Sequence, residues 1–199
     1  MSPRHVRLTL MLGAFLAGLV LCSALLFLVM GRVSGPNGQP VAAIGGPFQL
    51  TDQDGRTVTD QDLRGRPFLV FFGFTHCPEF CPTTLFEVSE ILRKLGPDAD
   101  RTRALFITVD PERDTPKVLK DYLSSFDPHL SGLTGDADAI AAVAKTYRAI
   151  YRKVPLDQGG YTMDHSLVVY LMDKQGRFVS PFSLKRTTEM SAAELRKHL

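Results

Sequence analysis

The sequence predicts an α/β fold in which one mixed β-sheet is covered by helices on both faces. Segments of strand character alternate with segments of helical periodicity through most of the 199-residue chain. The run Pro67–Phe74 (PFLVFFGF) is continuously apolar, which is typical of a strand buried on both faces of a sheet. Because the chain closes with a β-hairpin and a helix, the sheet is expected to be mixed rather than wholly parallel.

The first half of the predicted domain begins with a hairpin over Phe48–Thr59. Here FQLTD and RTVTD alternate in polarity, and Asp54-Gly55 supplies the turn. After the buried strand, Pro82–Leu95 has apolar residues at helical spacing, and Gly96-Pro97 ends that helix. The segment Arg103–Val109 (RALFITV) is predicted to be the next strand.

The second half continues the alternation of helix and strand. Thr115 and Asp136 are the expected N-caps of two helices, and Pro116 occupies the first helical position of the earlier one. The predicted elements are helices over Thr115–Phe126, Asp136–Tyr147 and Thr188–Leu199, and strands over Leu130–Leu133, Ser166–Met172 and Arg177–Val179.

The formal charge of +2 is unevenly distributed. Residues 1–33 contain three arginines and no acidic residue, whereas residues 34–199 contain 20 basic and 21 acidic side chains. The predicted domain is therefore nearly neutral. Because nucleic-acid-binding domains carry a basic stripe, this charge argues against that class of function.

The segment Leu8–Met30 predicts a transmembrane helix. Its 23 uncharged residues would extend about 34 Å, which is enough to cross a hydrocarbon core of about 30 Å. A cleaved signal peptide is the rival interpretation, but its apolar core would be only about 7–15 residues long. Leu21, rather than a small residue, precedes Cys22, so a lipoprotein site is not indicated and Cys22 is expected to be a small apolar residue of the span.

The arginines around the span predict its orientation. Arg4 and Arg7 precede it and only Arg32 follows closely, which places the N-terminus in the cytoplasm. Seven preceding residues are too few for an organellar transit peptide, so we expect a bacterial inner membrane with the domain in the oxidising periplasm. The expected organisation is a cytoplasmic stub (1–7), a transmembrane anchor (8–30), a Gly- and Pro-containing linker (31–40) and a folded domain (41–199).

The chemistry is expected in the segment Gly73–Pro82, which contains Cys77 and Cys81 between a buried strand and a helix. In a thioredoxin-like fold the working cysteines occupy this position. The helix N-terminus favours thiolates, and i, i+4 spacing can direct two sulfurs at one soft metal ion. A structural disulfide or two buried small apolar residues are the alternatives. A thiol peroxidase would need a proline upstream of its reactive cysteine, and GFTH contains none.

A metal held by two thiolates needs a third ligand, and five histidines are present. His165 follows YTMD at the expected start of a strand, where it could face the same rim as the cysteines. Asp164 could orient its imidazole, or it could equally cap the strand. The other four are weaker candidates. His5 lies across the membrane, His76 should point away from the cysteine loop, His129 lies in a loop and His198 is next to the C-terminus.

Three segments together resemble the Sco/SenC family of copper-handling proteins: GFTHCPEFCP, VDPERDTPKVLKDYL and YTMDHSLVVYLMDKQGRFV. The resemblance covers roughly residues 41–199 and implies a thioredoxin-like domain. It implies that Cys77, Cys81 and His165 bind one copper, as Cu(I) or Cu(II), and that the two cysteines also cycle to a disulfide. Asp110 and Asp114 are expected to brace the site rather than bind the metal.

The resemblance also implies a function: a membrane-anchored copper chaperone that helps to assemble the binuclear copper site of cytochrome c oxidase. The expected partner is the copper-bearing oxidase subunit, with another copper carrier or a thiol reductant as further partners. Two alternatives use the same residues. One is an enzyme, a thiol–disulfide oxidoreductase that reduces the cysteines of the oxidase site, and the other is a copper or redox sensor. A closed zinc site would require a fourth protein ligand, for which only His76 lies nearby in the sequence.

Overall fold

The computed structural model describes residues 16–26 and 44–199 of the chain. Residues 16–26 are helical. Within the described residues, no helix has both the length and the apolar character needed to cross a membrane. The predicted stub, the linker and the two ends of the predicted span over 8–30 lie outside these residues.

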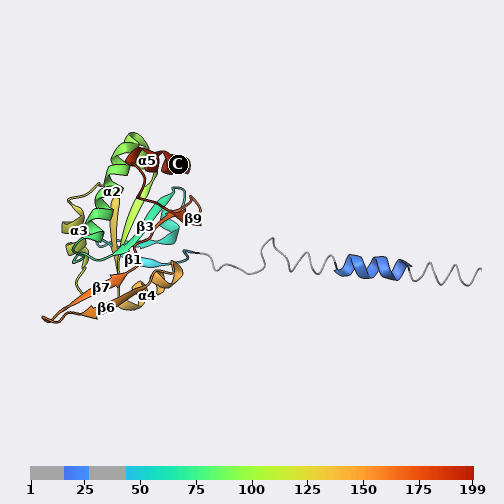
Figure 1. The fold of residues 1–199 in the computed structure, drawn as a ribbon, viewed down its shortest axis with the longest axis horizontal. Coiled ribbons are helices and arrows are strands. Elements are labelled where there is room, and N and C mark those ends of the chain that lie inside the picture. Colours follow the sequence, from blue (N-terminus) through green and yellow to red (C-terminus); the bar gives the residue numbers. More distant parts are fainter. Residues whose placement is uncertain (1–15, 27–43) are drawn as a thin grey trace, which may run out of the picture. The chain divides into compact units, whose positions relative to one another are not determined.

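The domain is built on a seven-stranded mixed sheet of order β2-β1-β5-β4-β3-β8-β9 (Figure 1). Strands β3, β4 and β5 are parallel at its centre, whereas β1 and β8 pair antiparallel with them from the two sides. The strands are β1 (Gln49–Asp52), β2 (Thr57–Thr59), β3 (Phe68–Gly73), β4 (Arg103–Thr108), β5 (Leu130–Thr134), β8 (Val169–Met172) and β9 (Phe178–Pro181).

All six residues of β3 are buried, as its continuous apolar sequence predicts. Phe71 pairs with Phe106 on β4, and Tyr122 of the following helix packs on the same ring with centroids 6.0 Å apart. Phe72 points to the opposite face and packs against Tyr147, with centroids 5.5 Å apart. Because successive residues of a strand alternate between faces, these contacts show that helices cover both faces of the sheet. The predicted mixed α/β architecture is thus confirmed.

Helices α3 and α4 begin where the sequence places their caps. The side chains of Thr115 and Asp136 accept hydrogen bonds from the N–H groups of Val118 and Ala139. Three helices differ from prediction at one end: α2 begins at Phe80, and α3 and α5 each end three residues early. The elements are α2 (Phe80–Leu95), α3 (Pro116–Leu123), α4 (Ala137–Thr146) and α5 (Thr188–Arg196), with short 3-10 helices η1 (Asp60–Leu63) and η2 (Gly96–Arg101).

A second, two-stranded sheet was not predicted. Strands β6 (Tyr151–Pro155) and β7 (Tyr161–His165) form an antiparallel hairpin between α4 and β8, and it projects from the main sheet at the lower left of Figure 1. The strand predicted over 166–172 accordingly begins only at Val169. The hairpin escaped prediction because charged side chains such as Arg152 and Lys153 interrupt its polarity pattern. Its turn residues, Gly159-Gly160, would nevertheless have indicated it.

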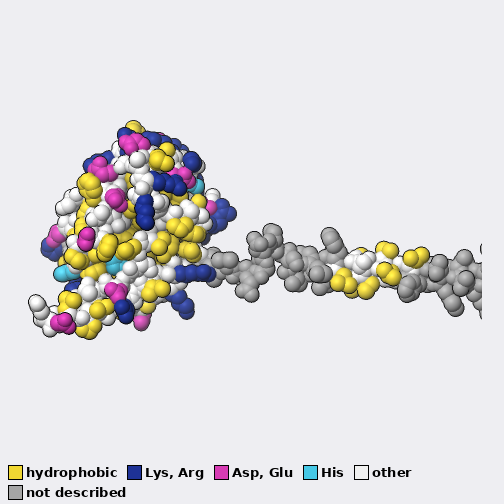
Figure 2. Space-filling model, in the orientation of Figure 1, with side chains coloured by type: hydrophobic (Ala, Val, Ile, Leu, Met, Phe, Trp, Pro, Cys, Tyr) yellow, Lys and Arg dark blue, Asp and Glu magenta, His cyan; other side chains and the backbone are white. Residues whose placement is uncertain are grey.

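Charged side chains of both signs are interspersed over the visible face of the domain in Figure 2, as the near-neutral composition of residues 34–199 predicts.

The partly buried side chain of His129 is paired on both sides of its ring. The ring of His129 lies between two carboxylates, with Nδ1 2.6 Å from Asp127 and Nε2 3.1 Å from Asp100. Burial opposes protonation of this ring, but the hydrogen bonds to Asp100 and Asp127 outweigh it and raise the pKa of His129 above its ordinary value.

We expect the His129 contacts to stabilise the domain more at acidic than at alkaline pH. A raised folded-state pKa contributes stability that is complete below the unfolded value of 6.5 and is lost as pH rises through the folded pKa. The loss of unfolding free energy in His129→Gln, of about 1 kcal/mol or less, should therefore be larger near pH 5.5 than near pH 8.5. Urea unfolding in reductant measures it, with the exposed His76→Gln as control. An equal loss at both pH values would contradict this assignment.

Candidate metal centre

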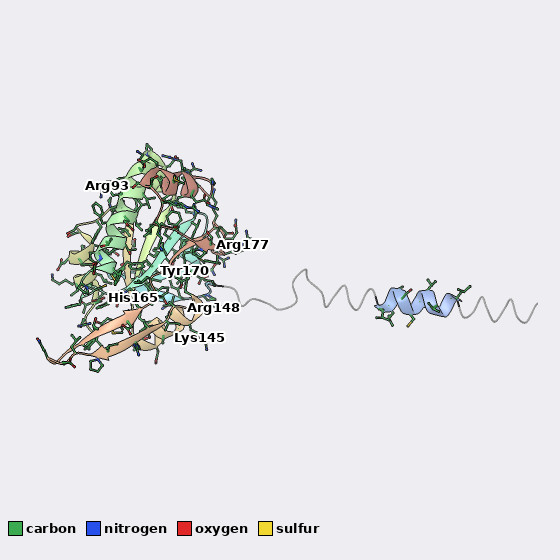
Figure 3. All side chains as sticks on the ribbon, in the orientation of Figure 1. Arg93, Lys145, Arg148, His165, Tyr170 and Arg177 are labelled. Carbon is green, nitrogen blue, oxygen red and sulfur yellow. The ribbon has the colours of Figure 1, made fainter. Side chains whose placement is uncertain are left out.

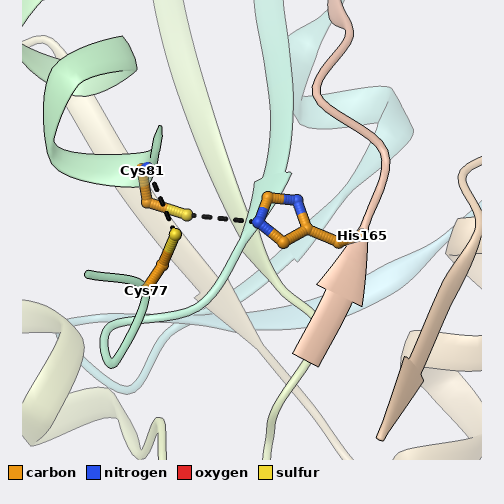
Figure 4. Close-up of side chains that lie close together, drawn as sticks. All are labelled: Cys77, Cys81 and His165. Carbon is orange, nitrogen blue, oxygen red and sulfur yellow. Dashed lines mark hydrogen bonds between the residues drawn. The ribbon is translucent and has the colours of Figure 1, made fainter. Parts of the chain in front are cut away.

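Cys77, Cys81 and His165 come together at the edge of the central sheet. Their ligand atoms all lie within 4.8 Å of one another, and the Sγ of Cys81 is 3.5 Å from Nε2 of His165 (Figure 4). Both cysteines are free thiols. Of the candidates considered from the sequence, this trio alone forms a cluster with metal-ligand geometry among the described residues.

The two cysteines lie where β3 turns into α2. The N–H of Cys77 donates to the carbonyl of Phe74 at 3.2 Å, and the N–H of Cys81 donates to the Sγ of Cys77 at 3.4 Å. Cys77 is 7% exposed and Cys81 is fully buried. The two thiols therefore differ: Cys77 lies nearer the surface and its Sγ accepts a backbone hydrogen bond, whereas Cys81 is fully enclosed.

Gly73, the last residue of β3, has no side chain and so leaves space for the sulfur of Cys81. A Cβ placed on Gly73 would lie 2.7 Å from the Sγ of Cys81 and 2.6 Å from the ring of Phe106. Burial raises the pKa of the Cys81 thiol, and the neighbouring Cys77 raises it further. Cys81 is thus a protonated thiol at neutral pH in the metal-free protein, and a metal that binds it must displace that proton.

His165 reaches the cysteines from the hairpin. The sequence predicts that His165 is the first residue of a strand in the main sheet. The structure shows that it is instead the last residue of β7 (Figure 3). Its Nδ1 lies 3.1 Å from the carbonyl oxygen of Ser166, which can only accept. Nδ1 therefore carries the hydrogen, and the lone pair of Nε2 faces Cys81. Burial lowers the pKa of His165, so the imidazole is neutral and can bind a metal.

The sequence leaves Asp164 as a carboxylate that either orients His165 or caps its strand, and the structure shows a different contact. Its carboxylate pairs instead with the guanidinium of Arg152 on the neighbouring strand, at 2.6 Å. Alternation along β7 contributes to this, because successive side chains of a strand leave in opposite directions and the carboxylate of Asp164 is directed at Arg152. Two aromatic rings fix the imidazole: Phe71 and Phe74 meet it edge-on, with centroids 6.1 and 5.7 Å away.

The loop after β4 holds the cysteine segment. The buried carboxylate of Asp114 accepts hydrogen bonds from the N–H of Thr75 at 3.0 Å and from its hydroxyl at 2.6 Å. The hydroxyl of Thr108, at the end of β4, donates to the same carboxylate at 2.6 Å. The predicted bracing role of Asp114 is confirmed by these contacts.

The same loop also holds the hairpin that carries His165. The hydroxyl of Tyr161 on β7 donates to the carboxylate of Asp110 at 2.9 Å, and Arg113 pairs with that carboxylate. Arg113 also donates to the carbonyl of Tyr161 at 3.0 Å, with its guanidinium carbon 3.8 Å from the ring centroid. Burial and the bond to Asp110 raise the pKa of Tyr161 to about 12, so its hydroxyl remains a donor.

Tyr161 and Arg113 were not identified from the sequence as site residues. Both lie in segments that carry chemistry, YTMDH and DPERDTP, but only the fold shows that they meet. The remaining described histidines lie elsewhere. His76 is exposed with Nδ1 3.1 Å from the hydroxyl of Thr75, and His129 and His198 contact carboxylates away from the cysteines. His5 lies outside the described residues.

Two thiols and one imidazole form an incomplete ligand set for a soft metal. Such donors suit Cu(I), and a closed structural zinc site would require a fourth protein ligand. A hollow of about 240 Å³ adjoins Cys77 and His165 but not Cys81. The ligand set is therefore sealed on the Cys81 side and open on the side of Cys77 and His165.

Comparison with known proteins gives consistent results. The SCO1/SenC family model matches residues 36–199. The chain is 41% identical over 162 residues to the mitochondrial protein SCO2 homolog of Bos taurus, an alignment that covers 79% of this chain and 61% of that protein. The chain thus spans about three fifths of this relative's length.

Two solved structures share the fold. ScoI of Bradyrhizobium japonicum, determined with copper bound, is 63% identical with a TM-score of 0.77, and the match covers 79% of this chain and all of that one. BsSco, described as having a disulfide switch and as a member of the Sco family of cytochrome c oxidase assembly proteins, is 25% identical with a TM-score of 0.62. That match covers 80% of this chain and 95% of BsSco.

We expect Gly73→Ala to disturb both the domain and the cysteine pair. The added Cβ would overlap the Cys81 sulfur and the Phe106 ring, both held in a packed core, so a loss of about 1–3 kcal/mol in unfolding free energy should result. Urea unfolding and the rate of oxidation of the two thiols measure the effects. Gly46→Ala is the matched control, because its Cβ would meet only ordinary contacts at 3.4 Å. Equal stability and equal oxidation rates in the two variants would show that Gly73 does not shape the site.

Proposed function

The chain belongs to the SCO1/SenC family, and from this premise we propose that it is a membrane-anchored copper chaperone for the binuclear copper site of cytochrome c oxidase. The observation that carries the proposal is the convergence of Cys77, Cys81 and His165, whose ligand atoms lie within 4.8 Å of one another. Copper is the cargo of this site, bound as Cu(I) or Cu(II), with one ion per chain.

The donor set supports copper over other metals. Thiolates and imidazole are soft or intermediate ligands that suit Cu(I), and with two sulfurs and one nitrogen the site can also accept Cu(II). Copper-bound ScoI of Bradyrhizobium japonicum, 63% identical to this chain, supports the same assignment. Because the shell is open beside Cys77 and His165, an incoming ligand can reach the metal there, as a carrier requires.

A second activity uses the same cysteines. The thiols of Cys77 and Cys81 lie close enough to form a disulfide after local adjustment, and the Sγ of Cys77 accepts a hydrogen bond from the backbone N–H of Cys81. Reduction of a partner's disulfide would oxidise this pair, with two electrons and two protons passing to the partner. The disulfide switch described for BsSco supports this alternative. Such a pair could also act as a copper or redox sensor.

The partner we propose is the copper-bearing subunit of the oxidase, with another copper carrier or a thiol reductant supplying metal or electrons. The apolar segment 8–30 is proposed to anchor the chain in a bacterial inner membrane, with the N-terminus cytoplasmic and the domain periplasmic. A tether of this kind raises the effective concentration of the domain near other membrane proteins. It therefore suits delivery to a membrane-bound oxidase.

The proposed site is tested by anaerobic Cu(I) titration of the reduced protein against a competing chelator. We expect one tightly bound copper per chain, and His165→Ala should weaken binding by about a hundredfold or more because it removes a ligand. His76→Ala is the control, since this exposed histidine is next to Cys77 in sequence but outside the cluster.

The same variants separate the two activities. Loss of copper binding in His165→Ala with unchanged oxidation of the two thiols supports a carrier. Equal copper binding by the wild type, His165→Ala and His76→Ala would contradict the three-ligand site and leave the cysteines as a redox pair.

The proposed topology predicts that protease added to intact bacterial spheroplasts digests the domain. Digestion should release soluble fragments of residues 41–199, whereas a cytoplasmic marker protein stays intact. The domain would remain protected until lysis if the orientation were reversed, and it would appear in the soluble fraction without protease if segment 8–30 were not an anchor.

A further inference from the structure

We propose that Met163 is a fourth, thioether ligand that engages Cu(I) on the open side of the centre. This inference rests on the proposed copper function and extends it, since the resemblance to the family and the cluster of thiols and imidazole include only Cys77, Cys81 and His165. It concerns the means by which a carrier with an incomplete shell holds Cu(I) and releases it.

The register of β7 places Met163 beside the site. Met163 and His165 are two residues apart on the strand, so their side chains leave the same face. Met163 is 8% exposed and belongs to the same buried cluster as Cys77 and Phe74. It is thus buried on the face of β7 from which the His165 side chain also leaves.

The hollow beside the centre supplies the second observation. The hollow has a volume of about 240 Å³, and Met163 lines it together with the two more accessible ligands, Cys77 and His165. Cys81 is fully buried and does not line it. An ion that enters or leaves through this hollow therefore passes the side chain of Met163.

The rest of the lining is poor in competing soft donors. It comprises Phe74, Pro78, Phe80, Thr162, Asp164 and Leu167. Asp164 offers a carboxylate, but that group is hard and already paired with Arg152. Apart from the two assigned ligands, the sulfur of Met163 is thus the soft donor of this lining.

A thioether gives chemistry that a third thiolate would not. It is neutral, so it binds without displacing a proton and adds no negative charge to the site. It is soft, so it favours Cu(I) over Cu(II) and over zinc. Because it is a weaker ligand than a thiolate, a partner's ligand can replace it first. Met163 would therefore stabilise Cu(I) while keeping one position exchangeable.

The chain provides a matched control. Met172 on β8 is fully buried and does not line the hollow, so Met172→Leu tests the general effect of replacing a buried methionine. Met163→Leu keeps the apolar volume and removes the sulfur, a change that packed interiors tolerate well. Thermal unfolding of both variants verifies that the fold is retained.

The experiment uses the full reduced chain loaded with one Cu(I). X-ray absorption at the copper edge should show three sulfur neighbours in the wild type and in Met172→Leu, but two in Met163→Leu. Release of Cu(I) to a chelator should accelerate about tenfold in Met163→Leu alone, with Cu(II) affinity unchanged. Selenomethionine labelling adds a test that does not alter the fold: a copper–selenium contact should appear in the labelled wild type and vanish in labelled Met163→Leu.

Absence of the copper–selenium contact, or equal sulfur counts in all three proteins, would overturn the inference and leave Met163 as a packing residue. That failure is distinguishable from failure of the proposed function. If only the Met163 inference fails, the wild type still binds Cu(I) with two sulfurs and the Cys81→Ser variant does not bind it. If the proposed copper function fails, Cys81→Ser binds copper as well as the wild type does.

Discussion

The buried carboxylate of Asp114 is the contact on which the geometry of the site depends. It accepts two hydrogen bonds from Thr75 in the cysteine segment and one from Thr108 at the end of β4. A carboxylate is stable in such a place only when its oxygens are satisfied, and removal of this acceptor would leave three donors unpaired. The loop that supplies Asp114 also supplies Asp110 and its partner Arg113, which engage the hairpin. One short loop therefore fixes the two halves of the centre relative to each other.

This arrangement explains how ligands 84 residues apart form one site. The cysteines are placed by the turn from β3 into α2, and the imidazole by a hairpin outside the main sheet. Neither element would hold the other alone, because the hairpin pairs with no strand of the seven-stranded sheet. The polar contacts of Tyr161, together with the edge-on rings of Phe71 and Phe74, keep Nε2 of His165 within 3.5 Å of the Cys81 sulfur. The ligands are preorganised, and less binding energy is lost in ordering them.

The parts of the fold that follow from local patterns were predictable, and those that depend on tertiary pairing were not. The buried run of β3, the caps at Thr115 and Asp136, and the hairpin turn at Asp54-Gly55 each carry a local signal that the structure bears out. Segment 151–165 carries only a weak signal, since its strands are partly exposed and the adjacent charges of Arg152 and Lys153 interrupt the alternation of polar and apolar residues. Because the hairpin was not predicted, the resemblance could identify His165 as a ligand, but the sequence analysis placed it at the start of a strand instead of at the end of β7. The partners of Asp164 and Tyr161 depend on the same register, so the sequence could not supply them.

The three residues proposed as ligands are unequal in a way that suits the proposed transport. Cys81 is sealed behind Gly73 and the Phe106 ring, and its burial raises the pKa of its thiol. Cys77 and His165 border the hollow, so a competing ligand meets them first. A metal held in this way is expected to exchange its ligands first at Cys77 and His165 and to dissociate from the sulfur of Cys81 last. Reprotonation of that sulfur then favours the empty state, because a buried thiolate without its metal is unstable.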